Sequence, residues 1–180
     1  MNQREFLLAI QSRVARVSVG ASTVRGRGHG GSVSAARRYL RQVKLNKFGA
    51  NPAEFRAALE KETSGLLKAL PKNARHWGIA RKLLNIFLRD CLYTTYLEEA
   101  YRLRSTQHEY ELPLDSITAL HLKRAAGRGS LPRWQGVKHV TAATSTTFQA
   151  AAKAVAVKKG IARVHLDAVW WSQSRDEDAA

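Results

Sequence analysis

The stretch from 79 to 92 constrains the fold more than any other part of the sequence. Its apolar residues recur at helical spacing and cover more than half of the helix circumference, as expected of a central helix that is buried on several sides. The helical pattern continues to about residue 103, which makes this the longest expected helix. No segment alternates in the manner of a β-strand, so the sequence predicts an all-α fold. The apolar residues of the stretch are Ile79, Leu83, Leu84, Phe87, Leu88, Cys91 and Leu92.

Further helical patterns occur on both sides of this stretch. A chain of 180 residues with 44% hydrophobic residues is long enough for one domain with its own core, and we expect a single helical domain over 1–180. The hairpin and active-site region spans about 66–126, and the C-terminal helices span about 142–171. Cys91 is the only cysteine, which excludes internal disulfides, zinc knuckles and four-cysteine iron–sulfur clusters. The other expected helices are 5–17, 32–45, 52–70, 115–124, 144–158 and 162–171.

The positive charge of the chain is far higher than solubility requires. Lys and Arg number 30 against 14 Asp and Glu, the formal net charge is +16 at pH 7, and the pI is about 10.7. Such a chain favours a polyanion as its partner, and nucleic acid over a membrane, because no apolar run approaches the roughly 20 residues that span a bilayer. The N-terminus lacks the layout of a secretory signal. We therefore expect a soluble, monomeric, cytoplasmic protein that associates with the nucleoid and requires no metal or organic cofactor.

A short polar turn, Leu70-Pro-Lys-Asn-Ala-Arg-His-Trp-Gly78, separates two helical runs. Proline and glycine in a turn between two apolar-periodic segments predict a helix-hairpin-helix. Lys82 then lies on the first turn of the second helix, and Asp115 opens a later helix. An amine and a carboxylate at the helix starts of a very basic protein are the groups needed to excise a base from DNA and then to open the backbone.

Lys82 has two interpretations. As a nucleophile it must be a free amine, which requires surroundings that disfavour the ammonium form. The positive end of a helix contributes only about 0.3–1 kcal/mol to this, so burial among apolar neighbours and the adjacent charge of Arg81 must supply the rest. As a structural residue, Lys82 would extend its amine to a phosphate or to water.

Asp115 also has two interpretations, and they are compatible. The segment Leu114-Asp-Ser-Ile-Thr118 is typical of a helix start with Asp115 as its N-cap. A carboxylate held there stays ionised and points outward, where it stabilises the positive charge that develops as a glycosidic bond breaks. Asp90 and Asp167 are the competing carboxylates, and Asp90 is expected to form an ion pair on the central helix.

Basic and glycine-rich connections supply candidate contacts to DNA. The segment 25–31 is too rich in glycine for regular structure, and its amides and two arginines are suited to bind phosphate, although a flexible loop explains the composition equally well. An extruded base stacks on aromatic side chains, for which tryptophans in basic connections are the better candidates. His165 and Asp167 either orient a base pocket or tie and cap the last helix. The candidate DNA contacts are Arg25, Arg27, Lys72, Arg75, His76, Gly78 and Arg81, and the candidate pocket residues are Trp77, Phe87, Trp134, His165 and Asp167.

Two segments resemble a known superfamily. Gly78-Ile-Ala-Arg-Lys-Leu-Leu-Asn85, followed by Leu112-Pro-Leu-Asp115, resembles the helix-hairpin-helix DNA glycosylases. The closing segment Arg163-Val-His-Leu-Asp-Ala-Val-Trp170 is similar to the C-terminal end of the archaeal-type 8-oxoguanine glycosylases, including the archaeal GO glycosylase group. The hairpin departs from the usual Leu-Pro-Gly-x-Gly pattern, because it is longer and poorer in glycine.

The resemblance implies a bifunctional N-glycosylase and AP lyase that acts on double-stranded DNA containing an oxidised base such as 8-oxoguanine. Lys82 would attack C1′ of the extruded nucleotide and form a Schiff base, with assistance from Asp115. Two other functions remain open. A non-catalytic DNA-binding module would use Lys82 and the basic residues of the hairpin only to neutralise phosphates. An accessory protein of DNA repair or of a mobile element would carry a decayed glycosylase fold.

Overall fold

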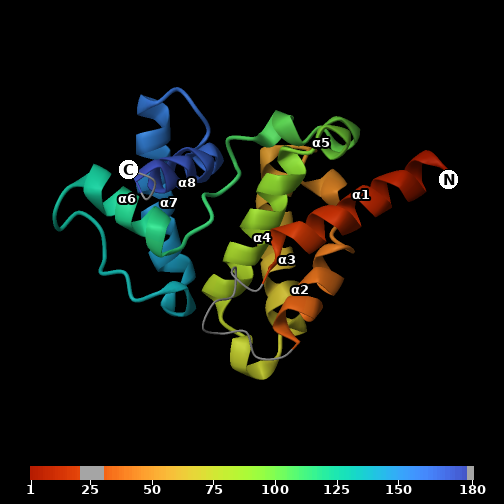
Figure 1. The fold of residues 1–180 in the computed structure, drawn as a ribbon, viewed down its shortest axis with the longest axis horizontal. Coiled ribbons are helices and arrows are strands. Elements are labelled where there is room, and N and C mark those ends of the chain that lie inside the picture. The colour runs from red at the N-terminus through yellow and green to blue at the C-terminus, as the bar shows by residue number, and fades with distance from the viewer. Residues whose placement is uncertain (21–30, 178–180) are drawn as a thin grey trace.

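The structure is a computed structural model that describes residues 1–20 and 31–177, with the side chains of these residues up to Trp171. Within this part of the chain it consists of eight α-helices joined by short 3₁₀ turns and connections, without a β-strand, which confirms the predicted all-α class. None of the described helices is long and apolar enough to cross a membrane. The helices form two groups that lie side by side (Figure 1).

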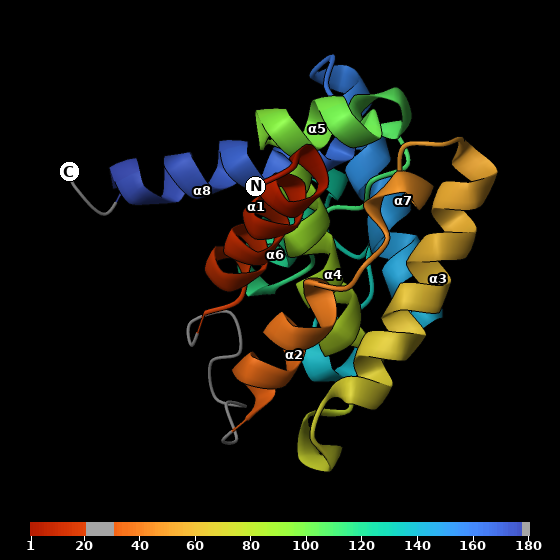
Figure 2. The same ribbon diagram turned by 90° about the vertical axis from the view of Figure 1, so that its right-hand side faces the viewer.

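Five helices form the first group, which we call the N-terminal lobe (residues 1–110). α4 lies at its centre, and α1, α2, α3 and α5 all pack against it (Figures 1 and 2). Most apolar side chains of α4 are almost inaccessible, from Ile79 at 5% exposure to Phe87 at 0%, and only Trp77 and Ile86 are half-buried, which confirms the predicted buried central helix. The helices of this lobe are α1 (Gln3–Ser18), α2 (Ser32–Leu40), α3 (Pro52–Ala69), α4 (Trp77–Leu92) and α5 (Thr95–Tyr101).

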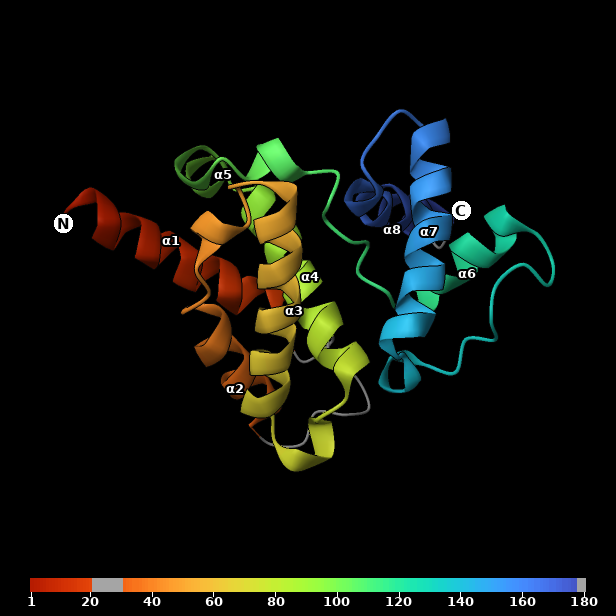
Figure 3. The same ribbon diagram turned by 180° about the vertical axis from the view of Figure 1, so that it is seen from behind.

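Three helices form the C-terminal lobe (residues 112–177), which is seen from behind in Figure 3. A second core, which includes Phe148 and Trp170, fills this lobe and is separate from the core around α4. The chain that we expected to form one domain therefore has two cores. The lobes contact each other where α4 meets α7 and the 3₁₀ turn η5 (Val137–His139). The helices of this lobe are α6 (Ser116–Ala126), α7 (Ala142–Lys158) and α8 (Leu166–Glu177).

Side-chain hydrogen bonds determine where two helices begin and end. Asn51 accepts from the N–H of Glu54 at 2.9 Å and starts α3, as the sequence predicts. The helix expected over 32–45 stops at Leu40 instead. The buried amide of Gln11 donates to the carbonyl oxygens of Leu40 and Val43 at 3.2 and 2.9 Å, so these carbonyls find a partner outside the helix.

The helix expected over 79–103 is interrupted after Leu92, so that prediction is wrong. Tyr93 ends α4, and Thr94 has the extended backbone of an N-cap, with φ −95° and ψ 105°. The Thr94 hydroxyl donates to the carbonyl oxygen of Asp90 at 2.7 Å, a side-chain bond of the kind that competes with helix continuation. Among the described helices, α3 is the longest, with 18 residues.

Candidate active site between the two lobes

Lys82 and Asp115 meet at the boundary between the two lobes. Lys82 lies on the second turn of α4, and Asp115 is the N-cap of α6. The Lys82 Nζ and Asp115 Oδ2 atoms are 3.6 Å apart, and the two side chains are 14% and 32% exposed. The fold therefore brings together the amine and the carboxylate that the sequence analysis singled out, in a partly buried ion pair.

The Asp115 carboxylate divides its oxygens between two partners. Oδ1 accepts from the N–H groups of Ile117 and Thr118 at 3.0 and 2.9 Å, whereas Oδ2 faces Lys82. The N–H of Asp115 donates in turn to Thr118 Oγ1 at 2.8 Å, which completes a capping box. The predicted N-cap is confirmed, and it leaves one oxygen for the amine. A role for Asp115 in chemistry stays a prediction.

A narrow crevice lies beside the pair, and Lys82 lines it whereas Asp115 does not. Its free volume is about 10 Å³, which is room for roughly one water molecule. A purine base does not fit into this space. The crevice is lined from the N-terminal lobe by Trp77, Gly78 and Asn85 and from the C-terminal side by Leu114, Val140 and Gln149.

Arg81 is buried and does not face DNA. Its Nε and Nη2 atoms donate to Glu111 at 2.8 and 2.9 Å. Its other N–H groups donate to Glu60, to Thr63 and to the carbonyl oxygen of Leu59. The predicted contact with DNA is wrong, because the guanidinium is used inside the protein. Burial alone would raise the pKa of Glu111, but the hydrogen bonds and charge of Arg81 outweigh burial and hold this pKa below its usual value.

Gly78 faces protein rather than phosphate. It lies on the first turn of α4, and a Cβ atom there would lie 2.1 Å from the carbonyl oxygen of Val137 and 2.8 Å from Val140 Cβ. Glycine is therefore required for the segment 137–140 to pack on α4. The close approach expected at this glycine is present, but its partner is the C-terminal lobe, so the predicted contact with DNA is wrong.

Gly78→Ala is expected to destabilise the protein by roughly 1–3 kcal/mol, because the backbone of Val137 must move to admit a methyl group. Gly65→Ala on α3 is the matched comparison. A Cβ atom there would meet the hydroxyl of Tyr39, the far end of a side chain that is able to move, so we expect a smaller loss. Urea unfolding of both variants measures the difference. Equal losses would show that α4 does not depend on this contact.

The remaining hairpin candidates lie in or beside the 3₁₀ turn η3 (Lys72–Ala74). Lys72 is exposed, and His76 is half-buried at the start of α4. Arg75 is exposed, and its guanidinium donates to two carbonyl oxygens near the end of α3 at 2.8 and 2.9 Å, so it already serves as a helix cap. DNA contacts by these three residues remain predictions. Arg25 and Arg27 lie outside the described residues.

Two of the three aromatic candidates lie at or near the crevice. Trp77 lines it. The indole N–H of Trp134 donates to Ser116 Oγ at 3.2 Å, immediately after Asp115 in the chain. Phe87 is fully buried in the core around α4, so its predicted role in a base pocket is wrong. Stacking of a base on Trp77 or Trp134 remains a prediction.

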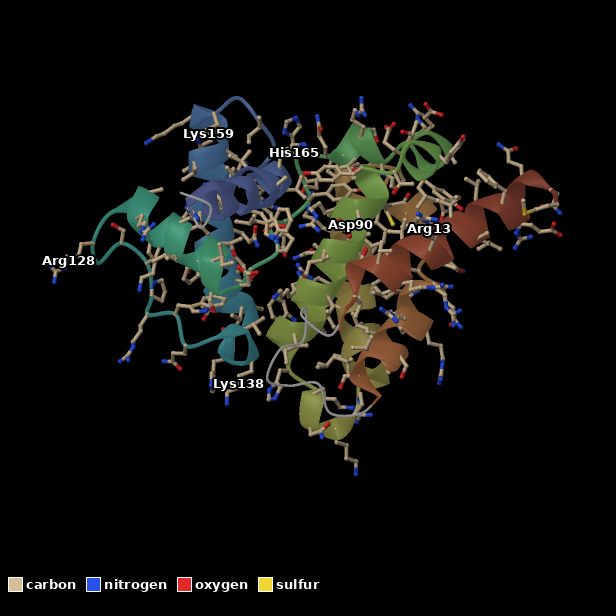
Figure 4. The ribbon with its side chains drawn as sticks, viewed as in Figure 1. Arg13, Asp90, Arg128, Lys138, Lys159 and His165 are labelled. Carbon is tan, nitrogen blue, oxygen red and sulfur yellow. The ribbon has the colours of Figure 1, made fainter. Side chains whose placement is uncertain are left out.

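His165 and Asp167 connect the C-terminal lobe to the end of α4. His165 Nδ1 lies 2.9 Å from the Tyr93 hydroxyl, and the two rings stack with centroids 5.6 Å apart. Asp167 forms an ion pair with Arg89, which also binds Asp90 at 2.8 Å, as predicted for that carboxylate. Figure 4 shows His165 and Asp90 along the boundary between the lobes. Neither His165 nor Asp167 lines the crevice, and both tie the start of the last helix to α4, as the structural interpretation expects; a role in a base pocket stays a prediction.

Two polar residues beside the crevice were not expected from the sequence. Glu111 is the carboxylate that pairs with Arg81, and Gln149 binds the backbone of Leu112. Gln149 stands between Phe148 and three alanines, and Glu111 is followed by Leu112, Pro113 and Leu114. That pattern indicates a buried group with a fixed hydrogen-bond partner, and it is the signal by which both could have been found.

The chain matches no protein-family model, no curated protein and no solved structure. In the part of the chain that the structure describes, no three His, Cys, Asp or Glu side chains are grouped as ligands for a metal ion. The crevice is lined by Lys82 and Trp77, and the Lys82 amine lies 3.6 Å from Asp115 Oδ2.

Proposed function

We propose that this protein is a DNA N-glycosylase with AP lyase activity, which excises an oxidised base such as 8-oxoguanine from double-stranded DNA. The observation that carries the proposal is the Lys82–Asp115 pair, an amine and a carboxylate 3.6 Å apart at the boundary of two lobes. A lysine nucleophile with a carboxylate beside it is the minimum that this reaction needs from a protein. The hairpin between α3 and α4 and the high positive charge support the same function.

The proposed reaction begins when Lys82, after losing a proton to solvent, attacks C1′ of the extruded nucleotide. The bond from C1′ to the base breaks, and the base leaves with the bonding electrons and takes up a proton. Asp115 Oδ2, which the cap does not use, stabilises the positive charge on the sugar during this step. The sugar ring opens to an imine between Nζ and C1′. Loss of a proton from C2′ then expels the 3′ phosphate, and water hydrolyses the imine to restore the amine.

The C-terminal lobe provides a surface suited to the DNA backbone. Residues 116–166 contain nine Lys and Arg and neither Asp nor Glu. Figure 4 shows Arg128, Lys138 and Lys159 at separate edges of this lobe. A segment so rich in positive charge and without carboxylates of its own attracts phosphate. The nine residues are Lys123, Arg124, Arg128, Arg133, Lys138, Lys153, Lys158, Lys159 and Arg163.

DNA binding is expected to depend steeply on salt, with the logarithm of the association constant falling by about 0.9 per phosphate neutralised for each unit of log salt. Replacement of Arg128 and Lys138 together by Gln should lower this slope by about one unit per residue that contacts phosphate. The matched control replaces Lys44 and Lys61 of the N-terminal lobe by Gln and should leave the slope unchanged. Fluorescence anisotropy measures both. A flat dependence on salt would argue against nucleic acid as the partner.

Borohydride trapping tests the enzymatic proposal. Borohydride reduces an imine to a stable amine, so the wild-type protein should become covalently attached to a duplex that contains its lesion, and without borohydride it should break the strand there. A panel of oxidised bases and an abasic site identifies the lesion. Absence of an adduct with every one of them would rule out the lyase.

The non-catalytic DNA-binding module is the second candidate, and one observation favours it. The crevice admits only about one water molecule, and the Lys82 amine already has a carboxylate partner there. In that case the ion pair of Lys82 joins the two lobes without a chemical role, and DNA binding by the basic surface is the function. The same would hold for an accessory protein with a decayed glycosylase fold. Salt-dependent binding without trapping would identify this candidate.

A further inference from the structure

The segment that carries Asp115 is fixed by side chains before it reaches α6. We call residues 109–115 the strap, because they connect the two lobes. Arg163, in the 3₁₀ turn η6 (Arg163–His165), donates to the carbonyl oxygens of Tyr110 and Glu109 at 2.8 and 2.9 Å. Glu111 is held by Arg81, as described above. The first half of the strap is therefore fixed to both lobes.

Gln149 fixes the second half of the strap. Its side chain projects from α7 and is 4% exposed. Nε2 donates to the carbonyl oxygen of Leu112 at 2.8 Å, and Oε1 accepts from the N–H of Leu112 at 3.0 Å. One side-chain amide thus satisfies both backbone groups of a fully buried residue, as a neighbouring β-strand would.

Gln149 is close to the site without being part of the ion pair. It lines the crevice, and the residue that it binds precedes Asp115 by three positions. Between them, the Pro113 carbonyl oxygen accepts from Thr118 Oγ1 at 3.1 Å, so the strap passes directly into the capping box of α6. A continuous series of contacts therefore runs from α7 through Leu112 to Asp115.

We propose that Gln149 is a positioning residue that holds Asp115 within reach of Lys82 by clamping Leu112. This inference rests on the proposed function, because it assigns Gln149 to the glycosylase reaction through Asp115. Gln149 itself does not touch the reacting atoms. If the clamp is lost, the Leu112 N–H and carbonyl must find water, and the strap must shift to admit it. A shift of about 1 Å is enough to cost a reaction about 100-fold.

Chemical labelling of Lys82 tests the clamp without any DNA substrate. Acetic anhydride is added briefly, and the extent of Lys82 acetylation is measured by mass spectrometry. Asp115→Asn removes the partner of the amine and should raise the labelling rate, and Gln149→Met should raise it to the same extent. Gln11→Met is the matched control, since Gln11 is, among residues whose side chains the structure describes, the other buried glutamine, 2% exposed, and binds backbone carbonyls far from the strap. It should lower stability but leave Lys82 labelling at the wild-type rate.

Gln149→Glu separates positioning from a general loss of stability. A buried carboxyl in its protonated form donates to the Leu112 carbonyl and accepts from its N–H, as the amide does, whereas the ionised form repels that carbonyl. The rates of Lys82 labelling and of base excision in this variant, each divided by the wild-type rate, should be near one at low pH. Both ratios should depart from one as pH rises through the pKa of the new carboxyl. Should Gln149→Met fail to fold, these ratios decide the question.

Base excision provides the second measurement. In Gln149→Met the single-turnover excision rate at saturating DNA should fall by about 100-fold, whereas the Kd for DNA should be unchanged, because no basic residue is altered. Wild-type labelling of Lys82 in Gln149→Met, or in Asp115→Asn, would overturn the clamp. A wild type that excises no lesion would overturn the proposed function alone, since the labelling result still decides whether Gln149 positions the pair.

Discussion

Lys82→Gln is expected to abolish borohydride trapping and strand cleavage while DNA binding is retained. The amide cannot form an imine, so no adduct can accumulate. One charge among 30 Lys and Arg residues is a small part of the electrostatic attraction, so the Kd should change little. The comparison requires trapping and anisotropy on the same lesion-containing duplex. A wild type that cleaves and a Lys82→Gln variant that cleaves equally well would show that a different amine is the nucleophile.

Asp115→Asn is the companion to this variant. Asparagine keeps the oxygen that accepts from Ile117 and Thr118, so stability should change by roughly 1 kcal/mol or less, while Oδ2 is replaced by an amide N–H₂ group. We expect excision to fall by orders of magnitude with α6 intact. A loss of activity no larger than the loss of folded protein accounts for would instead indicate that Asp115 is only the cap of α6.

Arg81→Met is expected to cause the largest loss of stability, about 3–5 kcal/mol, because it leaves an unpaired buried carboxylate. The affected group is Glu111, whose side chain is 13% exposed and whose oxygens bind Arg81 and Asn85. Arg56→Met is the matched control. Arg56 pairs with Glu109 at the surface, where its side chain is 62% exposed, and such pairs contribute about 1 kcal/mol or less.

Arg81→Met should also reverse the direction in which the contribution of Glu111 to folding stability changes with pH. In the wild type the pKa of Glu111 is lowered by Arg81. Its contribution to stability is therefore present above the unfolded pKa of about 4.3 and is lost as pH falls through the lower folded value. In Arg81→Met, burial without a partner raises the pKa of Glu111, so stability should fall as pH rises instead. Urea unfolding between acid and neutral pH measures both slopes. Parallel slopes would show that Glu111 is not held by Arg81.

Local signals in the sequence were sufficient for the features that depend on neighbouring residues. The caps at Asn51 and Asp115 depend on a side chain and an N–H two or three positions later, and both are present. The buried character of α4 follows from its apolar periodicity in the same way. The ends of helices that depend on distant partners were predicted less well, as at Leu40, where a side chain from α1 binds the carbonyl.

The expected site was wrong wherever the direction of a side chain decides its role. Arg81 is basic and adjacent to Lys82, but successive residues on a helix point in directions about 100° apart, so the Lys82 amine meets Asp115 whereas the Arg81 guanidinium binds the buried Glu111. Phe87 and Gly78 were assigned to substrate contacts for which their residue types are suited, and both are used in packing. Whether such a residue lies in the core or at the surface depends on how the two lobes meet. No local sequence pattern specifies that contact.

The Lys82–Asp115 ion pair joins two separately packed lobes, and under the proposed function this links the arrival of a nucleotide to the surroundings of the lysine. Lys82 is 14% exposed, and the crevice beside it has free volume for about one water molecule. Movement of the lobes that makes room for a base must also lengthen the 3.6 Å contact between Nζ and Oδ2. Under the proposed function, an arriving nucleotide thus acts on the same contact that joins the two lobes.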